Sequence, residues 1–360
     1  MATAEALAVV DADIHNLAPK IQALFPYLSD HWREYISTSA FKGAVDTSYP
    51  PAAPTTVSPQ WRAEDGDAPG STLASVQRDV LDGLGVDLGI LNLAYPLESI
   101  HNPDAAVALS RALNDWQLTE WLTPEPRLRG SVVVPNHYPP AAAEEIDRIG
   151  EQRGFVQVVL PARSEAPYGN RRYHPIWEAA TRHELVVGIH FGGSPGNPST
   201  ASGWPSYYIE EYVGMSHVFQ SHILSMIVEG VFDRFPTLRV TLIESGWTWM
   251  PALMWRLDKE WKGLRREVPW NHQVPSDYIR THMRVTTQPL DAAPDPRDTF
   301  RVVDQLGSDE LLLFGTDYPH WQEDRVNRAS DAFPIAVPDG LRQKIMGGNA
   351  RAWYRLGDRW

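Results

Sequence analysis

The sequence Val9-Val10-Asp11-Ala12-Asp13-Ile14-His15 decides the fold prediction, because it reads as a buried strand that ends in metal-binding side chains. Successive side chains of a strand point to opposite faces, so Asp13 and His15 share one face and can converge on one ion. A carboxylate oxygen and an imidazole nitrogen at a rigid strand end are half of a divalent-metal site. Alone, such a pair is more often a strand cap that bonds to the backbone, so the rest of the chain must decide.

The composition of the 360-residue chain bounds its class. At 43% hydrophobic it can bury a large core, and α/β barrels of this length often form one domain. The net charge of -13 argues against nucleic acid or an anionic membrane as partner. No apolar stretch approaches the roughly 20 residues that span a bilayer, and no signal peptide is evident, so we expect a cytoplasmic protein. Cysteine is absent, so any metal must take nitrogen and oxygen ligands.

Short apolar runs alternate with helical patterns along the chain. The predicted strands are Val9–His15, Leu88–Leu93, Ser131–Pro135, Phe155–Pro161, Leu185–Phe191, Arg239–Ser245, Met283–Pro289 and Leu311–Asp317. The predicted helices are Ser75–Gly83, Asp104–Leu122, Ala141–Gly150, Pro175–His183, Val218–Phe235, Trp249–Trp261, Asp298–Leu306 and Gly340–Tyr354. Eight strands alternating with helices predict an α/β fold, a (β/α)₈ TIM barrel that takes up residues 1–360 as one domain.

Two connections depart from this regularity. Residues 16–72 form a long first connection rich in proline, serine and aromatic residues, which we expect to fold as a cap inserted after the first strand. Residues Gly192–Tyr208 form a Gly/Pro/Ser loop directly after His190, placed like a lid or a pocket wall.

Candidate ligands stand at the ends of four predicted strands. Asp13 and His15 end the first strand, His190 lies on the fifth, Glu244 ends the sixth and Asp317 ends the eighth. In TIM barrels the sites form at these carboxyl ends. Burying so many polar and charged groups without a cation would cost several kcal/mol per group, so the set predicts a divalent-metal site. Asp317 and Glu244 are the candidate catalytic acid/base groups, since a carboxylate beside a metal-bound water can also take its proton.

Four further residues are candidates for substrate contacts. His320 follows Asp317 by three residues and is either a ligand or substrate contact, or a loop histidine packed on Trp321. Trp247 and Trp321 lie just beyond ligand strands and form either aromatic pocket walls or core packing. His222 either lines the pocket or has an ordinary surface or capping role on its own helix.

Several motifs show that the chain resembles the amidohydrolase-related (amidohydrolase 2) family, the branch with metal-dependent aromatic-acid decarboxylases. The resemblance is carried by Asp11–His15, Asn114–Trp116, Arg127–Ser131, Tyr173–Trp177, Gly188–His190, Gly230–Pro236, Glu244–Trp247, Gly315–His320 and Gly348–Ala350. It implies a distorted TIM barrel, a metal held by Asp13, His15, His190 and Asp317, and a homo-oligomer.

One position departs from this family pattern. Many members carry a His-x-Gly motif at the end of the sixth strand, where this chain has Glu244-Ser245-Gly246. Two histidines and three carboxylates suit Zn²⁺, Mn²⁺ or Fe²⁺ and could bind one ion or two. Glu244 is either a ligand or acid/base, or a group that orients His190 or a water.

Three functions remain open at this point. The leading hypothesis is a metal-dependent lyase or hydrolase that decarboxylates or hydrolyses a small carboxylate-bearing, aromatic or cyclic substrate. The second, motivated by Glu244, is a dinuclear Fe/Mn oxygenase that acts on a small amino or organic acid. The third is a metal-stabilised, non-catalytic subunit that supports an active paralogue in a hetero-oligomer.

Overall fold

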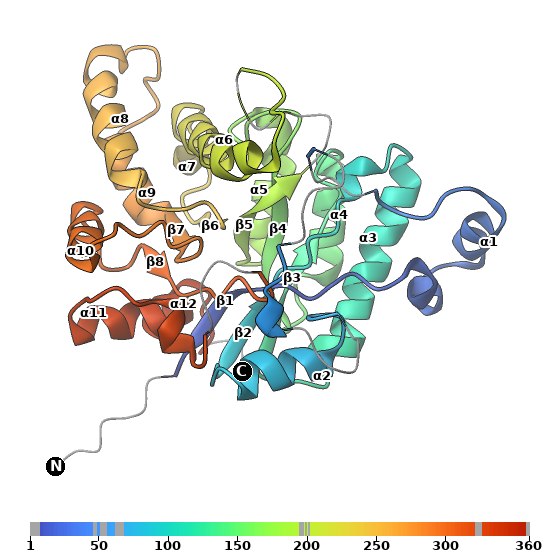
Figure 1. The fold of residues 1–360 in the computed structure, drawn as a ribbon. Coiled ribbons are helices and arrows are strands. Elements are labelled where there is room, and N and C mark those ends of the chain that lie inside the picture. The colour runs from blue at the N-terminus through green and yellow to red at the C-terminus, as the bar shows by residue number, and fades with distance from the viewer. Residues whose placement is uncertain are drawn as a thin grey trace.

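The alternating apolar runs form one parallel sheet whose strands follow sequence order (Figure 1). The computed structural model describes residues 8–45, 49–50, 56–61, 68–193, 198, 200, 202–320 and 326–357. Within them the strands are β1 (Val10–Ile14), β2 (Leu88–Leu91), β3 (Leu128–Val133), β4 (Phe155–Arg163), β5 (Val186–Gly193), β6 (Val240–Ile243), β7 (Met283–Thr286) and β8 (Leu312–Leu313).

The sheet curls so that β1 meets the chain around and after β8. The Ala12 amide donates to the Phe314 carbonyl at 2.8 Å, and the His15 amide donates to the Tyr318 carbonyl at 2.8 Å. These bonds bring the first and last strands together, as a barrel requires. The predicted (β/α)₈ TIM barrel is confirmed.

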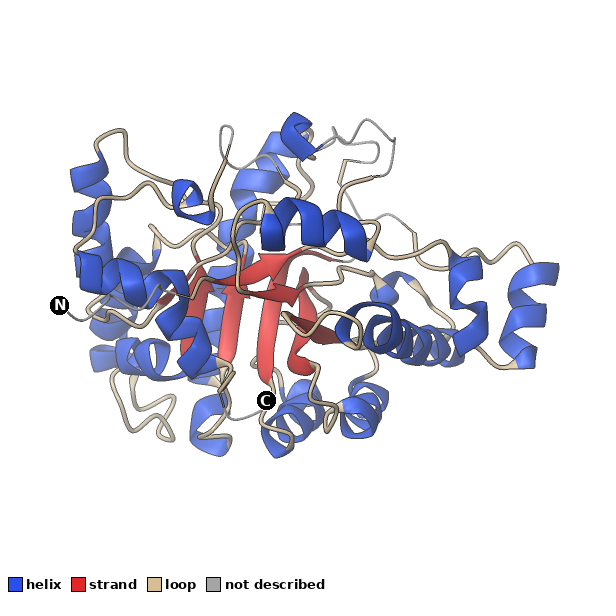
Figure 2. Cartoon of the chain, turned by 90° about the horizontal axis from the view of Figure 1, so that it is seen from below, coloured by secondary structure: helices blue, strands red, loops and turns tan. Residues whose placement is uncertain are grey.

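Helices surround the strands on the outside of the barrel (Figure 2). They are α1 (Asp30–Thr38), α2 (Leu73–Val76), α3 (Pro103–Gln117), α4 (Pro139–Ile149), α5 (His174–Arg182), α6 (Tyr208–Val228), α7 (Val231–Arg234), α8 (Met250–Leu264), α9 (Pro275–His282), α10 (Pro296–Gln305), α11 (Asp339–Gln343) and α12 (Asn349–Trp353). Their apolar faces cover strands that are buried along nearly their whole length, the usual condition of parallel strands. In the described residues, no helix is both long and apolar enough to cross a membrane.

Helices α1 and α9 are absent from the sequence prediction, and two predicted elements differ clearly in their bounds. Helix α6 begins ten residues before its predicted start, because Glu210 accepts the amide protons of Ser206 and Tyr207 and so caps the first turn. Its early residues Ile209 and Val213 are exposed and give no amphipathic signal. Strand β8 is shorter than predicted, because the chain leaves the ladder and turns toward Asp317.

The described parts of the first connection pack against the barrel. A 3₁₀ turn over Ile21–Tyr27 buries Ile21 and Leu24 and contacts α3. Further along, Val57 forms an antiparallel bridge with His320, beyond β8. Part of the predicted cap therefore lies on the loop that carries Asp317. Residues 194–197, 199 and 201 of the predicted lid lie outside the described residues.

Asn114 fastens three elements of the barrel wall together. Its side chain on α3 accepts from the Val133 amide of β3 at 2.9 Å, and donates to the Val133 carbonyl and to Glu145 of α4. We expect Asn114→Ala to lower the free energy of unfolding by about 3 kcal/mol, because it leaves buried polar groups without partners. Urea unfolding followed by circular dichroism measures this.

The neighbouring Asp115→Ala is the matched control. Asp115 lies on the same helix but pairs with Arg148 at the surface, so its loss should cost about 0 to 1 kcal/mol. Equal destabilisation by the two variants would show that the buried Asn114 bonds do not hold the wall.

Candidate metal centre

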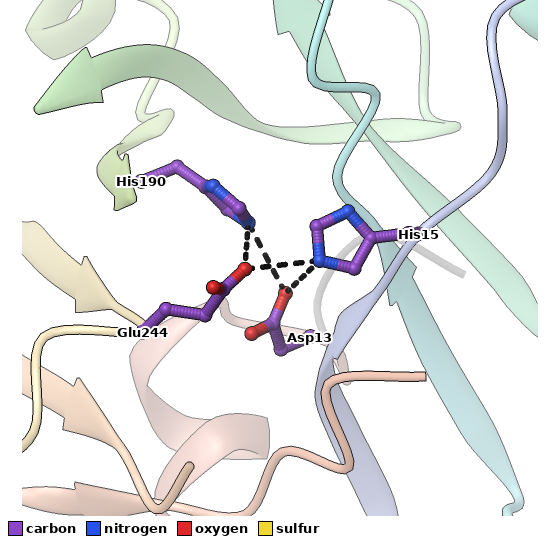
Figure 3. A group of neighbouring side chains, drawn as sticks. All are labelled: Asp13, His15, His190 and Glu244. Atoms are coloured by element: carbon purple, nitrogen blue, oxygen red, sulfur yellow. Dashed lines mark hydrogen bonds and ion pairs between the residues drawn. The ribbon is translucent and has the colours of Figure 1, made fainter. Parts of the chain in front are cut away.

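The predicted ligands come together at the carboxyl end of the barrel. Asp13 and His15 stand at the end of β1, His190 on β5, Glu244 directly after β6 and Asp317 shortly after β8. All five side chains are buried. Figure 3 shows the side chains of Asp13, His15, His190 and Glu244 pointing toward one another.

The distances within this cluster match those between ligands of one ion. His15 Nε2 lies 3.0 Å from Glu244 Oε1 and 3.1 Å from Asp317 Oδ1. His190 Nε2 lies 3.0 Å from Glu244 Oε1 and 3.6 Å from Asp13 Oδ1. Donor atoms that bind one ion at about 2.0 to 2.2 Å are about 3 to 4 Å apart. A divalent ion can therefore be held without rearrangement of these side chains.

Unpartnered atoms in the cluster support this fit. Asp13 Oδ2 and Asp317 Oδ2 are buried and have no hydrogen-bond partner in the described part of the chain. Such groups are costly unless an ion or water satisfies them. The Nδ1 atom of His190 donates to the Phe191 carbonyl at 2.9 Å, which leaves the lone pair of Nε2 for a metal.

The electrostatics of the cluster favour a cation. Burial opposes charge on His15, yet its bonds with Asp317 and Glu244 raise the pKa of His15 to about 10. Burial, assisted by the charge of Glu244, raises the pKa of Asp317 well above its usual range. Burial has the same tendency at Glu244, but His190 and His15 outweigh it and hold the pKa of Glu244 well below the usual value. The buried carboxylates thus stabilise positive charge on the neighbouring imidazoles, and a bound cation would be stabilised in the same way.

Two of the predicted ligands occupy strained backbone. Glu244 and Asp317 have φ of +56° and +57°, the left-handed region that non-glycine residues rarely adopt. Such conformations cost on the order of 1 kcal/mol or more and gather at functional sites. Each is held in place: the Glu244 amide donates to Thr286 Oγ1, and the Asp317 amide donates to the Asp13 carbonyl, both at 3.1 Å.

Asp11 stabilises the turn that carries Asp317. Its carboxylate accepts from the Thr316 amide at 3.0 Å and from the Thr316 hydroxyl at 2.6 Å. It also accepts from the amide of Asp13 at 3.0 Å. Asp11 therefore ties the strand that carries two ligands to the loop that carries Asp317.

A polar network inside the barrel orients Asp13, and the sequence analysis did not find it. Asn92 donates to Asp13 Oδ1 at 2.9 Å and accepts from Ser131 and Gln157. Tyr354 in turn donates to Gln157 at 2.9 Å. The sequence signal that could have revealed this network is a polar residue inside an apolar strand, most clearly Gln157 within Phe155–Pro161.

His320 lies at the edge of the cluster. Its ring is 4.8 Å from that of His15, and its Nδ1 is 2.7 Å from the Thr56 hydroxyl. It forms a second group of potential ligands with His15, Glu244 and Asp317. Trp321, the other residue proposed to contact it, lies outside the described residues.

Two residues predicted to contact substrate are buried and bonded to backbone atoms. Trp247 is fully buried in the core, where its indole N–H donates to the Thr287 carbonyl, so a role as a pocket wall is not supported. His222 is also buried: its Nδ1 accepts from the Tyr168 amide, and its Nε2 donates to the Ala162 carbonyl. Both ring nitrogens of His222 are therefore occupied by backbone partners, and its role as a substrate contact stays a prediction.

A pocket opens beside His190. Its walls come from the ends of β2 to β5 and the loops that follow them. Apolar side chains dominate these walls, with one carboxylic acid, Glu98, among them. Burial raises the pKa of Glu98 to about 7.

Comparison with known proteins identifies relatives over nearly the whole chain. The sequence model of a family described as amidohydrolase matches residues 10–356. Gamma-resorcylate decarboxylase from Rhodococcus jostii (strain RHA1) is 26% identical over 302 residues, which cover 79% of this chain and 88% of the relative.

Solved structures show the same fold. The 5-carboxyvanillate decarboxylase from Sphingomonas paucimobilis has a TM-score of 0.71 at 21% identity, covering 97% of this chain and 99% of that one. The 5-carboxyvanillate decarboxylase from Novosphingobium aromaticivorans, solved with manganese, has a TM-score of 0.70 at 19% identity, covering 97% and 96%.

The buried His222 should make the protein sensitive to acid. Burial lowers the pKa of His222 from 6.5 to about 4, so the folded state favours the neutral ring. That stabilisation is complete above the unfolded pKa and is lost as the pH falls through the folded pKa. Between pH 7.5 and 4.5 this group should cost the wild-type protein about 2 to 3 kcal/mol of unfolding free energy.

Urea unfolding of the chelated wild-type and His222→Asn proteins at both pH values tests this. The asparagine oxygen can replace Nδ1 as acceptor of the Tyr168 amide and asparagine does not titrate, so the loss between the two pH values should be smaller in the variant. Identical losses would contradict the assignment of a neutral, backbone-bonded His222.

Proposed function

This chain belongs to the amidohydrolase family, and from that membership we propose that it is a metal-dependent enzyme that removes the carboxyl group of a small aromatic acid. The observation that carries the proposal is the buried cluster of Asp13, His15, His190 and Glu244 at the barrel mouth, with Asp317 bonded to His15 beside it. The similarity to a gamma-resorcylate decarboxylase over 88% of that protein supports this reaction.

The cluster fits a divalent ion, and manganese is the first candidate. Asp13, His15, His190 and Glu244 would hold it, with Asp317 beside them. The manganese in the Novosphingobium decarboxylase supports this choice. When bound, such an ion supplies Lewis acidity and a template for the oxygens of the substrate.

Asp317 is the group that would move the proton. Decarboxylation breaks the bond between the ring carbon and the carboxyl carbon and replaces it with a bond to hydrogen. The ring carbon must therefore gain a proton while carbon dioxide leaves. Asp317 is fully buried, its Oδ1 is bonded to His15, and its Oδ2 has no partner in the described residues, so Oδ2 can hold that proton.

The pocket beside His190 suits the ring of such a substrate. Leu93, Val133, Val159 and Phe191 give it apolar walls that match the face of an aromatic ring and limit access of water. His190 belongs both to this pocket and to the ligand cluster, so a ring in the pocket would place its carboxylate near the metal. The pocket therefore favours a small, flat organic acid as substrate.

Among the functions left open by the sequence, the relatives favour decarboxylation. The proteins named above are decarboxylases of resorcylate or carboxyvanillate. This favours a lyase over a hydrolase, a dinuclear oxygenase or a supporting subunit.

Turnover of hydroxylated benzoic acids by the manganese-loaded protein tests the proposal. We expect 2,6-dihydroxybenzoate or 5-carboxyvanillate to lose carbon dioxide. Chromatography of the acid and its product measures this reaction. Chelation should abolish turnover and Mn²⁺ should restore it. Asp317→Asn should lower kcat by about 10²- to 10⁴-fold, the usual contribution of a positioned acid.

Asp339→Asn is the control, because Asp339 is an exposed aspartate at the start of α11. It should keep full activity. Turnover that survives complete metal removal would contradict the proposal, and so would a manganese-loaded protein that decarboxylates none of these acids.

A further inference from the structure

The pocket beside His190 contains one acidic side chain that the proposed function does not use. Glu98 lines this pocket together with the ends of β2 to β5 and the loops that follow them. Its side chain is half-buried. Apart from Tyr95 and His190, the other side chains in the described wall of the pocket are apolar. A carboxylate on such a wall needs a polar partner, and a ligand in the pocket can supply one.

The local structure fixes the position of Glu98. It lies in the 3₁₀ turn Leu97–Ser99, which follows β2. The Ser99 hydroxyl donates to the Pro96 carbonyl at 2.8 Å and accepts from the Val45 amide at 3.0 Å. The residues on both sides of Glu98 are thus bonded to each other and to the first connection. A ligand that binds the Glu98 carboxylate therefore has little backbone to order.

The positive charge nearest to Glu98 is already paired. This charge belongs to Arg163 at the end of β4. Its Nη1 atom lies 2.9 Å from Glu211 Oε1, and its Nη2 atom donates to the Gly193 carbonyl at 2.9 Å. Arg163 and Glu211 are both buried, and neither lines the pocket. One guanidinium thus serves two carboxylates, which leaves Glu98 as the excess negative group at the pocket wall.

The surroundings of Glu98 offer its carboxylate few hydrogen-bond donors. Burial raises the pKa of Glu98 to about 7, although a bond with its own amide and the charge of Arg163 oppose this rise. In the described residues, that amide is the one donor to the carboxylate. An O–H or N–H group of a ligand would stabilise the ionised form, because charged acceptors make the stronger hydrogen bonds.

The position of Glu98 indicates which part of a ligand it can contact. His190 belongs both to this pocket and to the ligand cluster, so an aromatic acid with its carboxylate at the cluster has its ring in the pocket. A ring hydroxyl or amino group can donate to Glu98, a methyl group cannot, and a second carboxylate would be repelled. Among the described lining residues there is no lysine or arginine that could bind a second carboxylate.

We propose that Glu98 selects the substrate by accepting a hydrogen bond from a hydroxyl or amino group on the ring of a monocarboxylic aromatic acid. It also excludes acids with a second carboxylate at that place. The inference rests on the proposed function and narrows its substrate class. Of the two acids named above, it favours 2,6-dihydroxybenzoate over 5-carboxyvanillate, which carries a second carboxylate. Because Glu98 acts on binding, its loss should raise KM for such an acid and leave kcat nearly unchanged.

Binding of substituted benzoic acids tests this selection without an activity assay. The manganese-loaded protein is titrated in a calorimeter with 3- and 4-hydroxybenzoate and with the methylbenzoates of the same positions. The corresponding aminobenzoates then distinguish a hydroxyl from an amino group as the preferred donor. At one position or both, we expect the wild-type protein to bind a donor-bearing acid about 10- to 100-fold more tightly than its methyl counterpart, the usual weight of a hydrogen bond to a charged group.

Two substitutions of Glu98 separate its charge from its role as acceptor. Glu98→Leu should abolish the preference for a donor, and Glu98→Gln should reduce it, since glutamine keeps one accepting oxygen and no charge. Isophthalate and terephthalate carry a second carboxylate at the same two positions. Glu98→Gln should bind one of them about tenfold more tightly than the wild-type protein does, because the repulsion between like charges is removed. A purely structural role of Glu98 would not improve the binding of any acid.

The exposed Glu144→Gln is the matched control and should bind every acid as the wild-type protein does. Equal binding of the hydroxy-, amino- and methylbenzoates by the wild-type protein overturns the inference, and so does binding of none of them. A donor preference that survives in Glu98→Leu and is lost in Tyr95→Phe also overturns it. The Tyr95 hydroxyl, which accepts from the Ala44 amide at 3.1 Å, would then be the selecting group.

The two proposals fail separately. A protein that shows the expected preference in binding but decarboxylates no aromatic acid would refute the proposed function and leave the role of Glu98 standing. Decarboxylation by a protein whose binding of these acids does not depend on Glu98 would do the reverse.

Discussion

The convergence of buried carboxylates on two imidazole nitrogens is the interaction on which this site depends. Three carboxylates in a barrel core repel one another, and removing them from water costs several kcal/mol each. The structure brings them within 3.0 to 4.0 Å of His15 or His190. Only positive charge at the centre makes that arrangement favourable, and the raised pKa of both histidines shows how strongly the cluster holds it.

The barrel supplies this convergence through its strand ends, and that part could be predicted from sequence. Asp13, His15, His190, Glu244 and Asp317 each follow an apolar run, and the ends of parallel strands meet at one rim. The positions of these residues along the chain were enough to predict that they meet, because the parallel order of the strands follows from their alternation with helices. The expectation of a homo-oligomer stays a prediction.

The features of the site that could not be predicted from the sequence depend on contacts between distant elements. The interior bonds of Asn92 and Gln157 depend on the register between strands, which no local pattern encodes. His222 and Trp247 stand in suitable places along the chain, yet their side chains turn to backbone partners in the core. Their direction is fixed by packing of α6 and of the turn after β6, not by spacing.

Glu244 is where this chain departs from the decarboxylases that it resembles. A carboxylate in place of the histidine that the resemblance leads us to expect adds charge and a second oxygen to the cluster, and its backbone there is left-handed. The most direct measurement is anomalous diffraction at the manganese edge from crystals of the loaded protein. We expect anomalous peaks within about 2.0 to 2.4 Å of His15 Nε2, His190 Nε2 and a Glu244 oxygen. A crystal of protein saturated with manganese that shows no anomalous peak within bonding distance of these atoms would contradict a metal centre at the barrel mouth.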